Sequence, residues 1–506
     1  MSDLVDIFVI GGGINGCGIA RDAAGRGYSV RLAEMNDLAS GTSSWSSKLI
    51  HGGFRYLEHY EFRLVREGLS EREVLLKSAP HIIWPLRFVL PHHKAMRPAW
   101  LLRLGLFLYD HIGKRKLLPG TKSVNLKTDP VGIPLRPVFS KGFEYSDCWV
   151  NDARLVVLNA RDAQNRGAIV NTRTQVISAI RVQNHWSITT RDRRSNDVQE
   201  YKAKLIVNAA GPWVDKVLGE ALDSKRSKNV RLVQGSHIVV PKIHDHDRAY
   251  IFQNADNRII FALPYEQDYT LIGTTDQDYV GDPSEVKITE SEIEYLCSAA
   301  SEYFEKPILK GDIVWAYSGV RPLFDDGASE AQEATRDYVL RVDGDSHEPS
   351  VINIFGGKIT TYRKLAEAML GKIETLIGVR NGPWTAGSHL PGGDFEVADY
   401  NKLVAKLKSE YGFLDLSLAQ RLIRSYGTDA WTMMEGAGKI DDMGFDFGGS
   451  LTEREVRYLM MYEWAESAED VIWRRSKLGI RLDEKSVSAL DDWMRINAGS
   501  ISQAAE

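Results

Sequence analysis

A glycine-rich turn near the N-terminus constrains the fold of this chain most strongly. The segment Val5–Gly16, which reads VDIFVIGGGING, predicts a strand, a tight turn and the start of a helix. Gly11 allows the turn, Gly13 lets the backbone approach a diphosphate, and Gly16 lets the helix pack close to the strand. Open amides at the helix N-terminus favour a phosphate. We therefore predict a Rossmann-type α/β unit that binds a dinucleotide.

Glu34 supports this interpretation and narrows the choice of dinucleotide. It follows a second predicted strand, Tyr28–Ala33, at the position where a carboxylate accepts hydrogen bonds from a ribose. The same carboxylate repels a 2′-phosphate. A cofactor with a free ribose at this position is therefore expected, and no NADP site is expected.

Length and composition limit the remaining possibilities. A chain of 506 residues is longer than one hydrophobic core usually supports. A net charge of −5 gives no general attraction to nucleic acid. Three scattered cysteines, Cys17, Cys148 and Cys297, exclude a disulfide framework and suggest no metal cluster, which suits a reducing cytosol. The N-terminus lacks the basic region of a signal peptide, and no apolar run is long enough to span a membrane. We expect several domains and a cytoplasmic protein.

The cofactor is expected to be FAD. Only one glycine turn of the dinucleotide type is present, so one dinucleotide is expected. A segment rich in serine, glycine and hydroxyl groups, residues 41–56, follows the dinucleotide unit. The segment Val351–Tyr362 repeats the order of strand, glycines and helix late in the chain. Together these two segments offer contacts to a second cofactor half that is larger than nicotinamide.

The predicted fold class is α/β with three parts. Residues 1–390 are expected to form the body, with FAD-binding portions at about 1–75, 150–225 and 345–375. Its substrate portions, at about 76–149 and 226–344, are expected to contain a mixed β-sheet, because strand-like runs alternate with polar turns there. Residues 391–506 are expected to form an all-helical C-terminal domain. The sequence from Thr452 to Glu455 predicts a capping box at the start of one of its helices.

Several motifs together resemble the FAD-dependent glycerol-3-phosphate dehydrogenases, in particular the bacterial aerobic, membrane-associated enzymes. They are the glycine turn, Ser46–Gly53, Arg55–Glu58, Ser236–His237, Gly273–Asp276, Ser318–Leu323, Phe355–Tyr362 and Asp470–Gly479. The resemblance covers nearly the whole chain. It implies a glutathione-reductase-like or D-amino-acid-oxidase-like FAD domain and oxidation of sn-glycerol 3-phosphate to dihydroxyacetone phosphate. It also implies that the reduced flavin passes electrons to a respiratory quinone.

The resemblance also indicates the residues of the site. The positions that match the family's substrate pocket are Arg55, Tyr56, Thr274, Arg321 and Lys358. The residues expected to contact FAD are Gly11, Gly13, Ile14, Asn15, Gly16, Glu34, Thr42, Ser43, Ser47, Lys48, Leu49, His51, Val176, Ala209, Gly211, Trp213, Gly357, Lys358 and Thr360.

The chemistry assigns roles to some of these side chains. A phosphate dianion needs fixed cations, for which arginine and lysine are suited, and Arg321 is expected to stabilise a developing alkoxide. The alcohol must also lose a proton, and His51 and His237 are the candidates to accept it, because a histidine side chain ordinarily titrates near neutral pH. Sequence alone leaves the choice of base open between them.

The segment from His92 to Lys122 predicts contact with an anionic membrane surface. It carries seven basic residues, Lys94, Arg97, Arg103, Lys114, Arg115, Lys116 and Lys122, and one acid, Asp110. The apolar stretch Trp100–Tyr109 between them is too short to span a bilayer but can lie in its interface. A second stripe, from Tyr362 through Leu365 and Met369 to Leu376, is expected to join it. We therefore expect peripheral attachment to the cytoplasmic face of the inner membrane.

Three other interpretations share parts of this pattern. A soluble glycerol-3-phosphate oxidase would use oxygen and would not need the basic segment. An amine or amino-acid oxidase would need a carboxylate clamp. A non-catalytic flavin redox sensor would need the membrane segment without the substrate cations. A homodimer would suit attachment to one side of a membrane.

Overall fold

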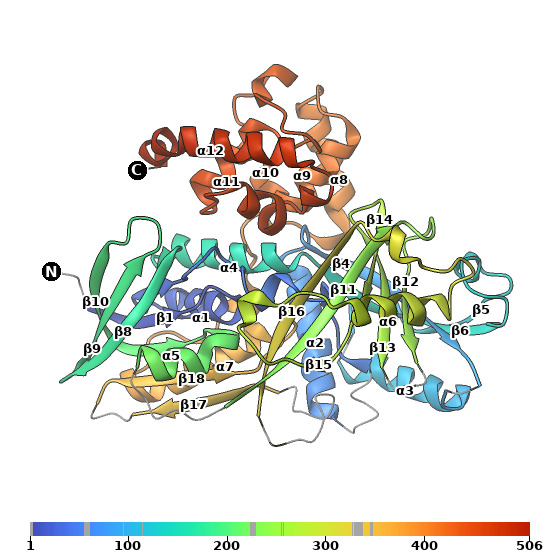
Figure 1. Ribbon diagram of the computed structural model, residues 1–506, viewed down its shortest axis with the longest axis horizontal. Helices are drawn as coiled ribbons and strands as arrows, with labels where there is room; N and C mark the ends of the chain where they lie inside the picture. Colours follow the sequence, from blue (N-terminus) through green and yellow to red (C-terminus); the bar gives the residue numbers. More distant parts are fainter. Residues whose placement is uncertain are drawn as a thin grey trace.

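The computed structural model describes residues 4–54, 61–94, 96–113, 115–222, 229–254, 256, 258–325, 327, 337–344 and 348–505. Two large sheets form the body, and a group of helices lies against it (Figure 1). The strands of the first sheet are β1 (Leu4–Ile10), β2 (Val30–Ala33), β7 (Ile169–Asn171), β8 (Thr174–Val182), β9 (His185–Asp192), β10 (Val198–Asn208), β17 (Val339–Asp343) and β18 (Ser350–Phe355).

The first sheet contains the glycine turn at its centre. Its strands follow the order β17-β18-β10-β1-β2-β7, with β9 and β8 extending from β10. The four pairs β1–β10, β1–β2, β2–β7 and β10–β18 are parallel. Parallel strands are covered on both faces, which explains why β1 is an unbroken run of buried residues from Val5 to Ile10. The glycine turn therefore lies at the carboxyl end of a buried strand.

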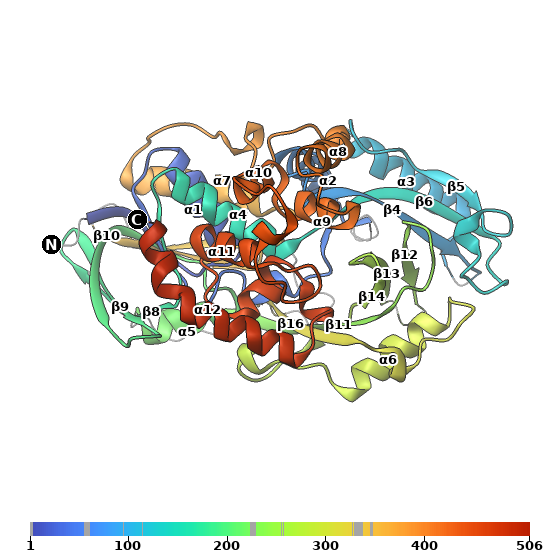
Figure 2. The same cartoon turned by 90° about the horizontal axis from the view of Figure 1, so that it is seen from above.

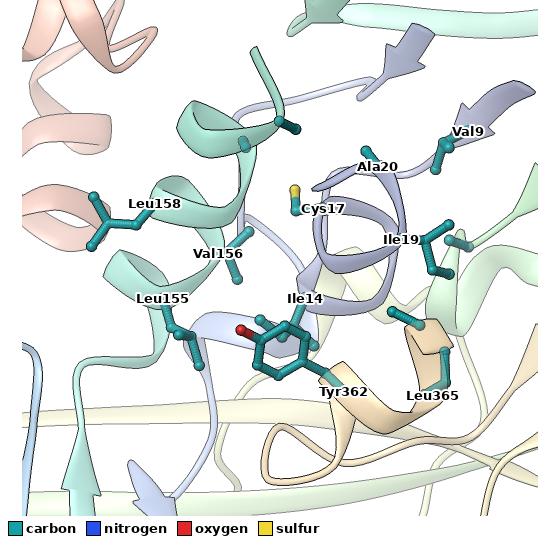
Figure 3. Packing of buried hydrophobic residues seen from close by; sticks show 14 of the residues in the cluster. Val9, Ile14, Cys17, Ile19, Ala20, Leu155, Val156, Leu158, Tyr362 and Leu365 are labelled. Atoms are coloured by element: carbon teal, nitrogen blue, oxygen red, sulfur yellow. The ribbon is translucent and has the colours of Figure 1, made fainter. Parts of the chain in front are cut away.

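Helices cover the body. They are α1 (Ile14–Gly25), α2 (Phe62–Ser78), α3 (Ala99–Ile112), α4 (Asp152–Asn165), α5 (Val214–Glu220), α6 (Glu290–Ser301) and α7 (Tyr362–Ile377). Figure 3 shows α1 packed between α4 and α7, with Cys17 facing Val156 and with Ile14 close to Tyr362. A Cβ atom on Gly18 would lie 2.6 Å from the Tyr362 ring, so this glycine sets the close approach of α1 and α7.

The apolar stripe of α7 was expected at a membrane surface, and that expectation is wrong. Tyr362, Leu365, Met369 and Ile373 are buried in the core between α7 and α1. A helix that covers one face of a sheet needs the same apolar periodicity as a helix that lies on lipid. The stripe therefore holds the first sheet together and is not available to a bilayer.

The second sheet is largely antiparallel. Its strands are β3 (Leu49–Ile50), β4 (Ile83–His92), β5 (Lys122–Asn125), β6 (Lys141–Val150), β11 (Val230–Pro241), β12 (Ala249–Gln253), β13 (Ile259–Tyr265), β14 (Tyr269–Gly273), β15 (Gln277–Asp278) and β16 (Trp315–Phe324). The order is β15-β11-β14-β13-β12-β4-β6-β3, with β16 beside β11 and β5 beside β6. Side chains of α2 and α3 pack on one face, and α6 packs on the other.

The C-terminal helices pack around a hydrophobic cluster of their own. They are α8 (Tyr400–Glu410), α9 (Leu416–Tyr426), α10 (Ala430–Met434), α11 (Glu453–Tyr462) and α12 (Glu484–Ala505). Seen from above, they lie across the middle of the body (Figure 2). A π-helix, Asp470–Arg475, lies between α11 and α12 and contacts α4. We refer to residues 400–505 as the helical domain.

The capping box predicted at Thr452 is wrong, although α11 does begin there. Thr452 makes no side-chain cap hydrogen bond. The Glu455 carboxylate instead accepts hydrogen bonds from Arg421, at 2.7 and 2.6 Å, and from the Tyr426 hydroxyl at 2.6 Å. Burial with an arginine on a neighbouring helix replaces the local contact that the sequence pattern suggested.

Candidate functional site

The glycine turn has a backbone that side chains would block. Gly11 has a φ of +109°, and a Cβ atom there would lie 2.6 Å from the carbonyl oxygen of Ala209. A Cβ atom on Gly16 would lie 1.9 Å from the carbonyl oxygen of Gly11. No side chain of the N-cap residue, Gly13, caps α1. The turn thus presents main-chain amides at a helix N-terminus, which is the arrangement that binds a diphosphate.

Glu34 lies just past the end of β2 and is fixed by two main-chain amides. Its carboxylate accepts hydrogen bonds from the amide of Gly12 at 2.6 Å and from the amide of Asn36 at 2.8 Å. Burial raises the pKa of Glu34, and these two amides act in the opposite direction. The carboxylate also borders the cavity described next, where it has the right chemistry to accept hydroxyl hydrogens of a ribose.

A cavity of about 730 Å³ extends from Glu34 past the glycine turn to the turn between β18 and α7. The predicted cofactor residues that line it are Gly11, Gly13, Ile14, Asn15, Glu34, Thr42, Ser43, Val176, Ala209, Gly211, Trp213, Gly357 and Lys358. They come from segments throughout the body. The structure thus gathers thirteen of the nineteen predicted residues around one space.

The turn after β18 contacts the start of α1, beside the first glycine turn, and both segments line the cavity. Asn15 donates a hydrogen bond from Nδ2 to the Gly356 carbonyl oxygen at 3.4 Å. Gly357 has a φ of +104°, and a Cβ atom there would lie 3.0 Å from the Asn15 side chain. The second glycine segment therefore lies beside the start of α1 in the cavity wall.

Six predicted cofactor residues do not line the cavity. They are Gly16, Ser47, Lys48, Leu49, His51 and Thr360. Lys48 is buried and donates to Asp152 Oδ2 and to the Ser44 carbonyl oxygen, each at 2.8 Å. Leu49 belongs to the core of the second sheet. The structure therefore places the Lys48 ammonium group on Asp152 and not in the cavity.

Sequence reasoning missed other residues of the cavity wall. Among them are Ser40, Thr174, Arg193, Pro322 and Ile354, whereas Gly41 belongs to the segment 41–56 that was expected to contact the cofactor. Ser40 and Gly41 lie next to Thr42, which was predicted. Thr174 and Arg193 carried no motif, because strands that only pack beside a cofactor do not need a special spacing.

His237 is a buried residue of β11 in the second sheet. Its Nε2 lies 2.8 Å from Ser47 Oγ, its ring stacks on Tyr317 at 4.8 Å, and its Nδ1 is buried without a hydrogen-bond partner. Burial, together with the charges of Lys48 and Arg321, holds the pKa of His237 well below its usual value. The imidazole is therefore neutral at pH 7 and able to accept a proton.

His51 has a different environment. Its Nδ1 accepts a hydrogen bond from the Gly53 amide at 3.1 Å, and its own amide donates to Thr360 Oγ1 at 3.3 Å. Burial lowers the pKa of His51, and Lys358 and Arg72 act in the same direction against Asp147. Because the Nδ1 lone pair is used, the neutral ring carries its hydrogen on Nε2.

Arg321 is held by the turn that follows β14. It donates to the Asp276 carboxylate, to Thr274 Oγ1 at 2.9 Å and to the Thr275 carbonyl oxygen at 3.3 Å. Thr274 and Arg321 are thus brought together as predicted, and Asp276 is a neighbour whose role the sequence did not reveal. Its carboxylate offsets part of the arginine's positive charge. Arg55 and Tyr56 lie outside the described residues.

Two family models and a solved structure match this chain. Residues 6–362 match the family model for FAD dependent oxidoreductases. Residues 384–503 match the model for the C-terminal domain of alpha-glycerophosphate oxidase. A solved glycerol-3-phosphate dehydrogenase from Bacillus halodurans, complexed with FAD, superposes with a TM-score of 0.76 at 27% identity, covering 99% of this chain and 91% of that one.

Curated relatives match at higher identity. A D-erythritol 1-phosphate dehydrogenase of Brucella abortus is 51% identical over 96% of this chain and 97% of its own length. A glycerol-3-phosphate dehydrogenase of Pseudomonas aeruginosa is 49% identical, covering 98% and 96%. The aerobic glycerol-3-phosphate dehydrogenase of Escherichia coli is 48% identical, covering 97% of both chains.

Proposed function

Because this chain belongs to the FAD-dependent oxidoreductases, we propose that it oxidises sn-glycerol 3-phosphate to dihydroxyacetone phosphate. The observation that carries the proposal is the 48–49% identity, over nearly the whole chain, to enzymes named for that substrate. The match of the helical domain to that of alpha-glycerophosphate oxidase agrees with it.

The cavity residues fit FAD. The glycine turn and the N-terminus of α1 would hold the diphosphate, and the Glu34 carboxylate would hold the ribose. Glycines at positions 11 and 16 leave the close approach that side chains would prevent. When bound, FAD accepts the hydride that the substrate's carbinol carbon gives up.

Two cations of the body, Lys358 and Arg321, suit a phosphate ester. Lys358 lines the cavity, whereas Arg321 does not line it, although the next residue of β16, Pro322, does. Arg321 is already oriented by Thr274 and Asp276, so it can hold an anionic oxygen without first losing side-chain freedom. We assign phosphate and alkoxide stabilisation to Lys358, Arg321 and Thr274. The family resemblance assigns Arg55 and Tyr56, which lie outside the described residues, to the same pocket.

A neutral histidine removes the hydroxyl proton. As the C–H electron pair leaves with hydrogen as hydride, the O–H proton must go to a base and a C=O bond forms. His237 is neutral and has an unused Nδ1, whereas the Nδ1 of His51 already accepts the Gly53 amide. We therefore assign the base to His237 and a hydrogen-bond donor role to His51.

The helix α3 is the proposed membrane contact. Trp100, Leu104, Phe107 and Leu108 lie on one face of α3 and are exposed, Trp100 to 69% and Phe107 to 53%. Exposed Lys94, Arg97, Lys116 and Lys122 flank this helix in the sequence, and Arg103 is exposed on the helix itself. Lys114 lies outside the described residues. An apolar helical face with basic flanks suits an anionic lipid surface.

Attachment of this kind would bring the enzyme to a lipid-soluble electron acceptor. Among the described residues, no helix combines the length and the apolar character needed to cross a bilayer. In Figure 1, α3 lies at the edge of the body away from the helical domain. We propose a membrane quinone as the acceptor of the electrons.

A second substrate is favoured by one observation. The D-erythritol 1-phosphate dehydrogenase of Brucella abortus is 51% identical to this chain, slightly more than the glycerol-3-phosphate dehydrogenases compared above. Both substrates present a phosphate ester and a secondary alcohol. The four-carbon substrate is therefore the second candidate, and it needs the same cations and the same base.

Anaerobic reduction of the flavin tests these proposals. Glycerol 3-phosphate should bleach the oxidised flavin, and glycerol and lactate should not. Erythritol 1-phosphate, compared by kcat/KM, decides between the two phosphorylated substrates. Failure of both to reduce the flavin would refute the proposal. Reoxidation by oxygen as fast as by a quinone analogue would instead indicate an oxidase.

A further inference from the structure

The helical domain contacts the body at several places, among them Arg154–Glu463 and Arg161–Asp429. One of these contacts is made by residues 473–477, which follow α11 and include the end of the π-helix. Arg475 donates two hydrogen bonds to Asp37, from Nη1 to Oδ2 at 2.7 Å and from Nη2 to Oδ1 at 2.8 Å. Both side chains are completely buried. The Trp473 ring stacks on Trp315 of β16 at 4.4 Å. The Asp37–Arg475 contact joins residues that are 438 positions apart.

Asp37 belongs to a segment that forms part of the cofactor cavity. We call residues 35–48 the cofactor loop, because Met35, Asn36, Ser40, Gly41, Thr42 and Ser43 line the cavity. The Ala39 amide donates to the Gly12 carbonyl oxygen at 3.1 Å. The Ser43 hydroxyl accepts the Ile14 amide, in the first turn of α1, at 3.0 Å. The cofactor loop and the glycine turn thus form one connected backbone surface.

The other end of the cofactor loop is held by Asp152 at the start of α4. Asp152 Oδ2 accepts hydrogen bonds from Ser46 Oγ at 2.7 Å and from Lys48 Nζ at 2.8 Å. Lys477 of the helical domain approaches Asp152 Oδ1 at 3.7 Å, and all three charged side chains are buried. Residues 473–477 therefore contact the supports of both ends of the loop.

The charge balance at Asp37 explains why this contact matters for the loop. A buried carboxylate is tolerated only when cations and hydrogen bonds surround it, and both Arg474 and Arg475 supply them here. Arg475 is itself fixed by the Glu463 carbonyl oxygen, which accepts from its Nη2 at 2.6 Å. Without Arg475, the Asp37 carboxylate would keep Arg474 as a partner but would lose the two paired hydrogen bonds that fix its direction. Asp37 lies in the same loop as Ala39 and Ser43, which contact the glycine turn.

We infer that Arg475 is a positioning residue for the cofactor: through Asp37 it sets the conformation of the cofactor loop in which the cavity binds FAD. Docking of the helical domain therefore contributes to cofactor affinity. This inference depends on FAD binding and is independent of the substrate. The inference requires two parallel hydrogen bonds from residue 475 to Asp37. A lysine at this position would keep the positive charge but lose the paired hydrogen bonds.

The test compares Arg475→Lys with a matched control in the same full-length chain. Arg421→Lys disturbs a buried pair inside the helical domain, Arg421 with Glu455, which has no contact with the cofactor loop among the described residues. Each protein is freed of flavin and titrated with FAD, with tryptophan fluorescence as the signal, and thermal unfolding is recorded separately.

We expect Arg475→Lys to raise the dissociation constant of FAD at least tenfold and to alter the visible circular dichroism of the bound flavin. Arg421→Lys should lower the unfolding temperature while changing that constant less than twofold. Equal dissociation constants in the two variants would overturn the inference. If Arg475→Lys does not fold, the double variant Asp37→Asn with Arg475→Gln leaves no unpaired charge. It should still bind FAD more weakly, and wild-type affinity in it would likewise overturn the inference.

Discussion

The guanidinium group of Arg321 donates to the carboxylate of Asp276, so part of the arginine's charge is balanced before any anion arrives. Replacing Asp276 by Asn keeps an acceptor for Arg321 and removes the competing negative charge. We expect KM for glycerol 3-phosphate to fall by about two- to fivefold, the range of a partly exposed ion pair. Asp278→Asn is the control, because Asp278 pairs with Arg231. An unchanged or higher KM for Asp276→Asn would show that Asp276 only orients the arginine.

Glu34 should control cofactor retention. Its replacement by Gln removes the negative charge and one acceptor from a carboxylate that holds the Gly12 and Asn36 amides. We expect the dissociation constant of FAD to rise by about tenfold or more, because charge-assisted hydrogen bonds contribute about 1.5–3 kcal/mol. Asp6→Asn serves as a control. Asp6 lies on β1, the neighbour of β2, but its carboxylate accepts hydrogen bonds from Ser29 and Lys204. Similar flavin content in both variants would contradict the assignment.

A methyl group at Gly16 should prevent formation of the site. Its Cβ atom would lie 1.9 Å from the Gly11 carbonyl oxygen, and neither backbone can retreat without moving α1 away from β1. Gly16→Ala is therefore expected to be purified without flavin or not to fold. Gly499→Ala, in α12 with no atom within 4 Å of the new methyl, should retain full flavin content and be as stable as the wild type or more so. Visible absorbance per protein measures both outcomes.

The pH dependence of kcat/KM should identify the residue that accepts the substrate's proton. The pKa of His237 lies well below its usual value, so the ring is neutral throughout the neutral range and becomes protonated only in acid. The acid limb of kcat/KM is therefore expected well below pH 6.5, and His237→Gln should lower kcat by about 10²–10⁴-fold. His237 also makes folding less favourable as pH falls below the unfolded value, because only the unfolded chain then takes up the proton.

His244→Gln is the matched control for that experiment. Burial and the neighbouring His246 lower the pKa of His244 to about 4, but His244 lies in the turn after β11 and away from the cavity. Its loss should reduce the acid sensitivity of unfolding and leave kcat unchanged. If the rate falls equally in both variants, or if the acid limb lies above pH 6.5 in the wild type, His237 is not the base.

The exposed face of α3 should bind lipid. Replacing Trp100 and Phe107 by Ser removes two large exposed apolar side chains, so the fold should lose little stability. We expect binding to anionic liposomes in a sedimentation assay to fall at least about tenfold, with dye-coupled activity retained. Ile496→Ser removes an equally exposed apolar side chain from α12, and its liposome binding should match the wild type. Equal binding of all three proteins would contradict the proposed membrane face.

The glycine turn and Glu34 could be predicted from the sequence because their spacing is local. Strand, turn, helix and acidic residue lie within the first 34 positions, and each has a fixed geometric role. The fold class followed from the same unit together with the later glycine segment at Gly356 and Gly357. The family resemblance then indicated an FAD-binding body with a helical domain, which the family models and the solved structures confirm.

Partners that are distant in the sequence could not be predicted. Arg321 and Asp276 are 45 positions apart, and Arg475 and Asp37 are 438 positions apart. No periodic pattern in the sequence indicates that either pair is in contact. The apolar stripe of α7 suggested lipid because a helical pattern does not distinguish a bilayer from a protein core. Lys48 was expected beside the cofactor, but a buried carboxylate, Asp152, lies within its reach.

The order of the strands sets when the cofactor can be captured during synthesis. The central strand β1 emerges from the ribosome first, but its neighbour β10 ends at Asn208 and the closing turn follows β18, which ends at Phe355. The arginine that holds Asp37 emerges later still. A nascent chain therefore exposes its glycine turn before the residues that complete the cavity wall, up to Ile359, have been synthesised.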